Sequence, residues 1–565
     1  MTAMIFRVSG RTLKGFLFVC LLLTFPWVAA APPNNAVASA DLLATKAGLE
    51  ILGQGGNAFD AAVALSAALA VVEPTGSGLG GGGFWLLHRA SDGKQTMIDG
   101  RERAPLAASR EMFLNRDGGF DQQRSINGPL SAGIPGMPAA TVHLAQHYGR
   151  LPLKTSLAPA IHYAREGFVV GETYLRSIVL RHPVMENFAA AADIFLQNGA
   201  VPEAGFRLIQ KDLADTLVQV AERGRAGFYS GPVAEALVKG TRDAGGLWTL
   251  RDLDEYRVVE REPLDADYKG IRITSAPPPS SGGIVLTEAL NILSGFDLGH
   301  MDAIDRTHLV VEAMRRAYRD RASYLGDPDF VSMPIERLTS MAYADQLRAD
   351  VRLDRAGFPV KKPSAIPAAL IEGQNTTHFS IIDREGNRVA ATLSINYPFG
   401  SCFVPPGTGV LLNDEMDDFV SREGGGNIYG LVGGESNRIE PGKRMLSSMT
   451  PTFLEDQDRV AILGTPGGSR IISMVLLATL DFAQGKAVDS WVRVPRYHHQ
   501  TLPDVVQYEK GSLTEKEVTA LQEKGHQLKE TNRRYGNMQA VLWDKRNNKV
   551  TAASDPRGEG WALVR

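Results

Sequence analysis

The pattern of the chain changes at Asn375. Much of what precedes it, including residues 139–240, has the apolar spacing of amphipathic helices. Beyond it, apolar runs at 379–382 and 388–393 flank the turn sequence Arg-Glu-Gly-Asn at 384–387, which is typical of a β-hairpin. A second hairpin-like stretch closes the chain. Long helices combined with antiparallel hairpins predict stacked sheets flanked by helices.

Residues 39–72 are predicted to form two helices. Ser39 can cap the first helix, and Asn57 with Asp60 forms a cap-like start for the second. The second helix is apolar on nearly all sides, which indicates that it is buried. A glycine-rich run at 76–83 then leads into a strand. This order argues against a dinucleotide fold, which needs the strand before the glycines.

Residues 1–30 have the features of a secretory signal peptide. Three basic residues precede an apolar run, and the small residues at 28–30 suit a cleavage site. The alternative is an uncleaved membrane anchor, but the run is short and is interrupted by Pro26. No other stretch is long and apolar enough to span a bilayer. We therefore expect a soluble periplasmic or secreted protein, with no membrane contact after signal removal.

Charge, cysteines and histidines exclude several classes of function. The net charge of -3 gives no electrostatic reason to expect nucleic acid as a partner. Cys20 leaves with the signal peptide, so Cys402 cannot form an internal disulfide, and it is predicted to be a buried packing residue. No HExxH, Cys/His or P-loop pattern occurs. We predict that the protein uses no metal and no cofactor.

Thr376 opens the first strand after an irregular stretch at 353–374, which is predicted to be an exposed loop. A threonine hydroxyl is a weak nucleophile, but cleavage of the chain before Thr376 would give it a free α-amine. That amine, with an ordinary pKa of about 7.7–8.0, can act as general base on the same residue. Considered alone, the segment still favours an ordinary Thr-rich strand start.

Several short motifs follow one another in a specific order and change that interpretation. They are Gly-Gly-Asn-Ala-Phe-Asp-Ala at 55–61, the glycine-rich run at 80–84, Asp-Gly-Arg-Glu-Arg-Ala-Pro at 99–105, 278–283, Thr-Thr-His-Phe-Ser at 376–380, 413–419, Leu-Ser-Ser-Met at 446–449, and Pro-Gly-Gly-Ser-Arg at 466–470. In this order and spacing, the chain from Ala38 to Arg557 resembles the γ-glutamyltranspeptidase family of N-terminal nucleophile hydrolases.

The resemblance implies an α+β fold, a four-layer αββα sandwich formed by two chains from one self-cleaved precursor. A large subunit of residues 31–375 would remain paired, as a heterodimer, with a small catalytic subunit of residues 376–565. The family transfers γ-glutamyl groups from glutathione and related γ-glutamyl compounds to water, amino acids or peptides. It needs no cofactor, because the γ-glutamyl group is carried as an ester on the threonine.

The resemblance also implies the catalytic pair. Thr376 would be the nucleophile and the new N-terminus, and Ser394 stands where the family usually has a threonine, with its hydroxyl near the nucleophile's amine. The hairpin supports this proximity. With a four-residue turn, Asp383 pairs with Arg388, which puts Thr376 opposite about Ile395 and next to Ser394, to within one residue of register.

A γ-glutamyl donor carries an α-carboxylate, an α-ammonium and a γ-carbonyl, and the resemblance supplies groups for each. Arg101 is placed like the family's carboxylate-binding arginine, with Arg103 as the nearby alternative. The remaining implied groups are Ser447 and Ser448 for the same carboxylate, Asn396, Glu415 and Asp418 for the ammonium, Gly467 and Gly468 for the oxyanion, and Tyr429 in a lid over the donor. Without the resemblance, the acidic pair at 417–418 is typical of a solvated loop.

The glycine pair has support of its own, because it lies between a predicted strand at 460–463 and a predicted helix at 471–480. Free N–H groups at a helix start face developing negative charge.

The sequence therefore predicts an enzyme, a γ-glutamyltransferase or glutathione hydrolase. One alternative is a glutaryl-cephalosporin acylase, a relative with the same nucleophile, which has no reason to keep a full ammonium-binding set. Another is a non-catalytic periplasmic binding protein on this scaffold, against which the intact Thr376 and glycine pair argue.

Overall fold

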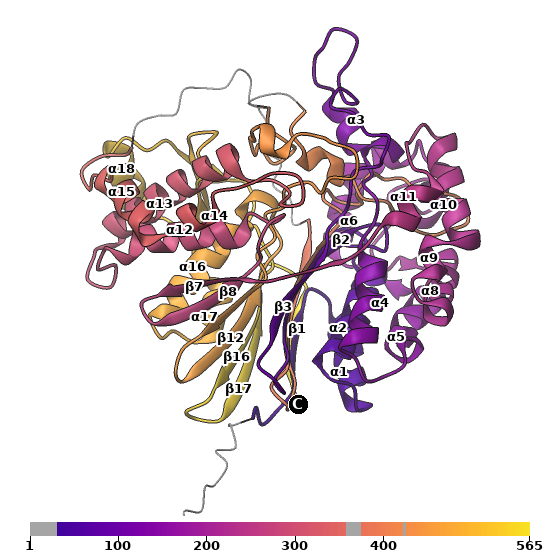
Figure 1. The fold of residues 1–565 in the computed structure, drawn as a ribbon, viewed down its shortest axis with the longest axis horizontal. Helices are drawn as coiled ribbons and strands as arrows, with labels where there is room; N and C mark the ends of the chain where they lie inside the picture. The colour runs from indigo at the N-terminus through magenta and orange to yellow at the C-terminus, as the bar shows by residue number, and fades with distance from the viewer. Residues whose placement is uncertain (1–30, 358–374, 422–424) are drawn as a thin grey trace, which may run out of the picture.

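The structure is a computed structural model that describes residues 31–357, 375–421 and 425–565. The predicted signal peptide at 1–30 and most of the predicted loop, at 358–374, lie outside the described residues. Two β-sheets stack in the middle of the molecule, and helices cover their outer faces (Figure 1). The predicted four-layer αββα sandwich is therefore confirmed.

The first sheet is fully antiparallel and mixes strands from both sides of Asn375. Its order is β18 (Trp561–Val564), β1 (Ala36–Ser39), β9 (Thr377–Ile382), β10 (Arg388–Ser394), β2 (Gly82–His88), β3 (Gln95–Gly100) and β6 (Val259–Arg261). The strand that begins with Thr377 thus lies inside the sheet, where neighbouring strands hold it on both sides.

The second sheet is also antiparallel. Its order is β17 (Lys549–Ser554), β16 (Gln539–Asp544), β12 (Arg459–Gly464), β11 (Thr452–Glu455), β8 (Ile271–Ser275) and β7 (Leu264–Tyr268). The predicted closing hairpin is β16–β17. In β2, Phe84 and Leu86 belong to the core between the sheets, whereas Trp85 and Leu87 face the helices, as strand alternation requires.

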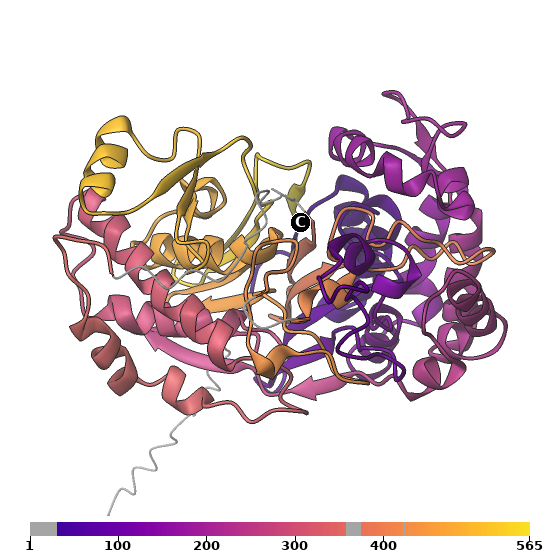
Figure 2. The same cartoon turned by 90° about the horizontal axis from the view of Figure 1, so that it is seen from above.

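The two outer layers come from different parts of the chain. Helices before residue 260 cover the first sheet, and later helices cover the second, as seen from above in Figure 2. The first layer includes α1 (Leu42–Gly53), α2 (Ala58–Val72), α4 (Met137–His147), α5 (Leu153–Glu166), α6 (Glu172–Met185), α8 (Lys211–Arg223) and α10 (Gly231–Asp243). The second includes α12 (Gly282–Ser294), α13 (Ala303–Tyr324), α15 (Met341–Ala349), α16 (Ile471–Ala483) and α18 (Glu515–Glu523).

The start of α2 follows its prediction, whereas the start of α1 does not. Asn57 and Asp60 form a reciprocal capping box, and every residue of α2 is buried. Ser39, however, ends strand β1 instead of capping α1. Asp41 is the cap, because its side chain accepts from the first free amides of α1 while the backbone of Ser39 pairs within the sheet.

The hairpin β9–β10 forms as predicted, but its register differs by one residue. Ile382, and not Asp383, lies opposite Arg388. The turn is one residue longer than predicted, because Asp383 belongs to it: the Asp383 carboxylate accepts hydrogen bonds from both the backbone and the side chain of Asn387. Thr377 consequently pairs with Leu393, and continuing this register puts Thr376 opposite Ser394.

Candidate active site

Thr376 lies at the start of β9 and is 4% exposed. Its Oγ1 is 3.2 Å from Ser394 Oγ, which in turn accepts a hydrogen bond from the backbone N–H of Asn396. Thr376 has a φ of 96°, a left-handed conformation that is strained for a β-branched residue. The hairpin therefore brings the predicted nucleophile and the predicted hydroxyl partner into contact.

The other predicted site residues gather around the same place. A cavity is lined by Arg101, Thr376, Ser394, Asn396, Glu415, Asp418, Tyr429, Ser447, Ser448 and Gly468, together with Leu431, Met449 and Ile471. Gly467 is the predicted residue that does not line it. The cavity volume is about 20 Å³, little more than one water molecule needs, so side chains must separate to admit a ligand.

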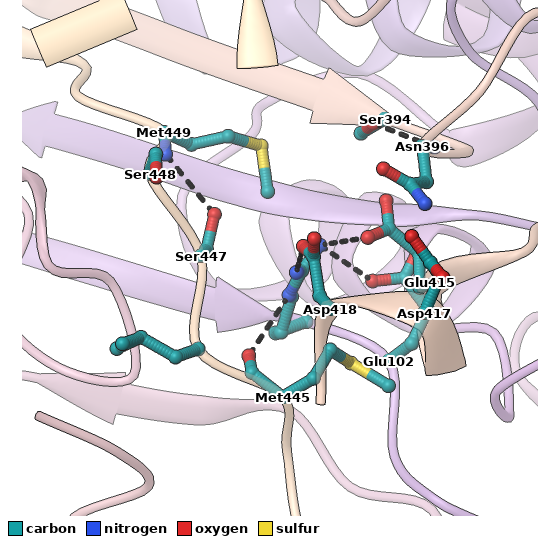
Figure 3. Close-up of polar contacts among 12 residues, drawn as sticks. Glu102, Ser394, Asn396, Glu415, Asp417, Asp418, Met445, Ser447, Ser448 and Met449 are labelled. Carbon is teal, nitrogen blue, oxygen red and sulfur yellow. Dashed lines mark hydrogen bonds and ion pairs between the residues drawn. The ribbon is translucent and has the colours of Figure 1, made fainter. Parts of the chain in front are cut away.

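Arg101 occupies the centre of an ionic cluster that closes one end of this cavity. Its Nη1 lies 2.7 Å from Glu415 Oε2 and 3.4 Å from Glu102 Oε2, and its Nη2 lies 2.6 Å from Asp418 Oδ2. Figure 3 shows Glu102, Glu415 and Asp418 converging there, while Nε donates to the carbonyl of Met445. Three carboxylates thus surround one guanidinium.

The cluster holds more carboxyl groups than Arg101 alone can pair with. Burial raises the pKa of Glu415 to about 7, although Arg101 opposes this, and burial raises the pKa of Glu102 well above its ordinary range. Burial alone would lower the pKa of Arg101, but Glu415, Glu102 and Asp418 raise it instead. A second cation in this cluster would therefore be stabilised.

Arg103, the alternative to Arg101, points elsewhere. Its Nε donates to the carbonyl of Gly442, and its Nη1 donates to that of Glu255. It does not line the cavity that holds Thr376. The geometry therefore favours Arg101 over Arg103 as the arginine of the site.

Ser447 and Ser448 form the wall beyond the ionic cluster. Ser447 Oγ accepts from the backbone N–H of Met449, as Figure 3 shows, and Ser448 Oγ accepts from Nη2 of Arg321. Arg321 is a buried residue of α13 that sequence reasoning missed, because nothing in the helix pattern distinguishes it from solvated arginines. Glu102 was also missed, although its position beside Arg101 was a usable signal.

Gly468 and Tyr429 close the cavity from another side. Gly467 has a φ of 142° and Gly468 one of 57°, in the turn between β12 and α16. A Cβ at Gly468 would lie 2.7 Å from the Tyr429 ring, so the ring rests directly on this glycine. The Tyr429 hydroxyl donates to the carbonyl of Asn396. Tyr429 therefore lines the cavity between Gly468 and Asn396, and residues 422–424 of its loop lie outside the described residues.

The segment at 415–418 is not a solvated loop. It is a short 3-10 helix, η2 (Glu415–Asp418), and Asp417 is buried, with its carboxylate bound by Ser125 Oγ and the Ile428 N–H. Burial raises the pKa of Asp417 to about 7. Asp417 thus braces the loop, while Asp418 faces Arg101.

Three further observations concern the rest of the chain. Cys402 is a buried free thiol that accepts a hydrogen bond from Arg181, as expected of a packing residue. Within the described ranges, no group of three or more His, Cys, Asp or Glu side chains is arranged to hold a metal ion. Among the helices of the described residues, none is long and apolar enough to cross a membrane.

The motifs and this geometry agree with a comparison with known protein families. The family model described as Gamma-glutamyltranspeptidase matches residues 44–564. The chain belongs to this family. A γ-glutamyltranspeptidase relative from Pseudomonas sp. (strain A14), named glutathione hydrolase proenzyme, is 42% identical over 90% of this chain and 89% of its own length. The relative of the same name from Escherichia coli (strain K12) is 41% identical over 93% of this chain and 90% of its own.

Solved structures extend the comparison within the γ-glutamyltranspeptidase family. The crystal structure of a cephalosporin acylase from Bacillus halodurans matches with a TM-score of 0.84 and 30% identity, covering 96% of this chain and 98% of that one. The predicted family and enzyme class are confirmed. The roles predicted for the individual site residues remain predictions.

Proposed function

We propose that the chain cleaves itself between Asn375 and Thr376, and that the product transfers γ-glutamyl groups from glutathione-like donors to water or amino acids. The observation that carries this proposal is the position of Thr376. Its hydroxyl contacts Ser394 at one end of a cavity whose other end is the Arg101 cluster. A nucleophile and a charged recognition site thus face one small space.

Self-cleavage begins with attack of Thr376 Oγ1 on the carbonyl carbon of Asn375. The C–N bond breaks, the acyl group moves to the oxygen as an ester, and water hydrolyses that ester to free the hydroxyl and the α-amine. The left-handed backbone at Thr376 supports this step, because such strain costs on the order of 1–3 kcal/mol and cleavage releases it.

Transfer then uses the free amine as the base. The amine accepts the hydroxyl proton while Thr376 Oγ1 attacks the γ-carbonyl, and it returns the proton to the leaving amine. The amides of Gly467 and Gly468, at the start of α16, would stabilise the oxyanion. Water or an amino acid then attacks the γ-glutamyl ester, giving glutamate or a new γ-glutamyl compound.

Donor recognition follows from the charges of the ionic cluster. The α-carboxylate would bind Arg101, Ser447 and Ser448, and the α-ammonium would bind between Glu415, Asp418 and the side-chain oxygen of Asn396. A zwitterion would exchange the ion pairs between Arg101 and the carboxylates for equivalent ones with its own charged groups. It would also bring the second cation that the surplus carboxylates favour.

A glutaryl-cephalosporin acylase is the second candidate, favoured by the likeness to the solved cephalosporin acylase. A glutaryl group lacks the α-ammonium and would leave Glu415 and Asp418 without a partner for their charge. We therefore place γ-glutamyl donors first. We further propose that residues 1–30 direct export to the periplasm or the medium, and that both subunits stay together after cleavage.

The test is the state of the purified protein. Two bands on a denaturing gel, with the small chain beginning Thr-Thr-His-Phe-Ser by Edman sequencing, are expected. Thr376→Ala should remain uncut and should not hydrolyse a γ-glutamyl anilide. A single band from the active wild type, or a different first residue, would contradict the proposed cleavage.

A further inference from the structure

A second group of carboxyls lies behind the strand that carries the nucleophile. Glu73, the residue after α2, lines a cavity of about 240 Å³ together with Asp41 and Glu559. Pro466, which precedes the glycine pair, also lines this cavity. The cavity therefore adjoins the glycine turn without being part of the site described above.

The start of β9 lacks a strand neighbour on one side. Strand β1 ends at Ser39, which pairs with Phe379, so Thr377 and His378 extend beyond it. Thr377 shares the helix-facing side of β9 with Phe379, because side chains alternate along a strand. Whatever holds this end of β9 on that side must therefore come from the region of α2.

Glu73 occupies that position. A Cβ added at Gly76 would lie 3.0 Å from the carbonyl oxygen of Thr376 and 3.4 Å from Cδ of Glu73. The carboxyl group and the peptide that follows the nucleophile thus share one tightly packed space. A side chain at position 76 would force one of them to move by a few tenths of an ångström.

The polar atoms in this space are not yet paired. Glu73 Oε2, Thr377 Oγ1 and Ser77 Oγ are all buried and have no hydrogen-bond partner among the described residues. The Thr377 hydroxyl is nevertheless close enough to Glu73 to lower the pKa of its carboxyl. Buried polar groups without partners are costly, so a short movement that pairs them is favourable.

The protonation state of Glu73 decides what it can donate. Burial, with smaller contributions from the charges of Asp41 and Glu559, the other titratable groups facing it, raises the pKa of Glu73 to about 8 against the opposing effect of the Thr377 hydroxyl. At neutral pH the carboxyl is therefore mostly protonated and carries an O–H. An ionised carboxylate could not donate, and it would repel the Thr376 carbonyl oxygen.

We propose that Glu73 is a positioning residue for Thr376. Its carboxyl group, in the neutral form, hydrogen-bonds to the Thr377 hydroxyl and the Thr376 carbonyl oxygen, and thereby fixes the end of β9 that carries the nucleophile. This inference rests on the proposed function, because it assumes that Thr376 attacks the donor.

The test compares Glu73→Gln with Glu73→Leu on fully cut protein, using a γ-glutamyl anilide from pH 6 to 10. Glutamine stays neutral and keeps a donor and an acceptor, so its kcat at pH 7 should stay within about threefold of wild type. Leucine should lower kcat by about 10- to 100-fold with little change in KM, as expected for a misplaced nucleophile. Above about pH 8, kcat should fall in the wild type but not in Glu73→Gln.

Glu559→Gln provides a matched control at the same cavity. It removes a neighbouring charge but keeps an oxygen that accepts from the N–H groups of Glu172 and Thr173. It should move the high-pH fall of kcat to lower pH and leave the maximal kcat unchanged. A purely structural role for Glu73 predicts no such movement.

Two results would overturn the inference: superimposable pH profiles for wild type and Glu73→Gln, or equal losses in Glu73→Gln and Glu73→Leu. If Glu73→Leu fails to fold or to cut, the profile of Glu73→Gln against wild type decides alone. A wild type that neither cuts itself nor hydrolyses the anilide would instead refute the proposed function.

Discussion

Among the three acids around Arg101, Asp418 is the one that a ligand can reach. Its side chain is 13% exposed, whereas those of Glu102 and Glu415 are 0% and 1% exposed. An arriving ammonium would therefore meet Asp418 first and Glu415 behind it. Its partner Asn427 donates to the other carboxylate oxygen and holds the group in place. Discrimination between donors should depend strongly on this one side chain.

We predict that the wild type prefers a γ-glutamyl anilide over the matched glutaryl anilide by roughly 30- to 150-fold in kcat/KM. A buried unpaired charge costs about 3–5 kcal/mol, and water and protonation reduce this to on the order of 2–3 kcal/mol. Asp418→Asn should shrink the ratio by slowing the γ-glutamyl reaction only. Asp417→Asn is the control, since Asp417 binds Ser125 and not the cavity. Equal kcat/KM values for the two anilides on wild type would favour the acylase function over γ-glutamyl transfer.

At the scale of elements, the turn between β12 and α16 fits against the loop that carries Tyr429. Gly468 lies at the contact, and the Tyr429 ring covers it. The carbonyl of Tyr429 also accepts a hydrogen bond from Gln500, so the loop is held from two sides. The turn that carries Gly468 and the loop that carries Tyr429 are thus one packed unit.

Gly468→Ala should disrupt the packing between this turn and the loop that carries Tyr429. We expect about a tenfold or larger loss of kcat/KM on cut protein, because the new Cβ would displace the Tyr429 ring and misplace the turn. Gly485→Ala is the matched control: Gly485 is left-handed too, follows the other end of α16, and has open space around it. In the background of Tyr429→Ala, Gly468→Ala should cost much less, because the clash is gone. Additive losses would argue against contact between turn and lid.

At the scale of the whole molecule, a histidine pair joins the two parts of the chain on either side of Asn375. His308, in α13, and His526, just after α18, share a 2.7 Å contact between Nδ1 and Nε2. His308 Nε2 donates to the carbonyl of Arg352, so its Nδ1 must accept the proton of His526. Nδ1 of His526 is then buried without a partner among the described residues.

Protonation of His526 should therefore weaken this junction. Burial lowers the pKa of His526 to about 3, so the unfolded chain, with an ordinary value of about 6.5, binds a proton that the folded protein does not. Stability from this group is present above about pH 6.5 and is lost as the pH falls. When the pH falls from 7 to 5, the free energy of unfolding should decrease by about 2 kcal/mol less in His526→Gln than in wild type, as measured by urea denaturation. The exposed His162, replaced by Gln, should match wild type.

The elements that sequence predicted best are those in which local signals agree. In α2, Asn57 and Asp60 indicate where the helix starts, and its apolar sequence indicates that it is buried. The β12–turn–α16 unit follows from the apolar runs on either side of the glycine pair. Strand β1 was missed because its four residues carry no local pattern. It exists through pairing with β9 and β18, which lie hundreds of residues away.

The contacts within the candidate site could not be predicted from local sequence either, because they depend on residues that only the tertiary structure brings together. Arg101 and Asp418 are 317 residues apart, and the sequence assigned them to two different charged groups of a donor. That they bind each other follows only from how the first sheet, η2 and α13 come together. The one-residue shift in register has a local cause, since the side-chain hydrogen bonds of Asp383 draw this residue into the turn and make the turn longer than its sequence alone predicts.

The strand order of the first sheet has a consequence for how the protein must be made. β9 and β10 lie between β1 and β2, and β18 lies beyond β1, so strands from the two sides of Asn375 are interleaved. If the bond before Thr376 broke during synthesis, the two pieces would have to find each other by diffusion instead of at the high effective concentration of one chain. Folding must come first and cleavage second. If the two subunits were encoded by two genes, this unimolecular assembly would become a bimolecular one. The topology of the sheet is therefore reason enough for both subunits to be encoded in one reading frame.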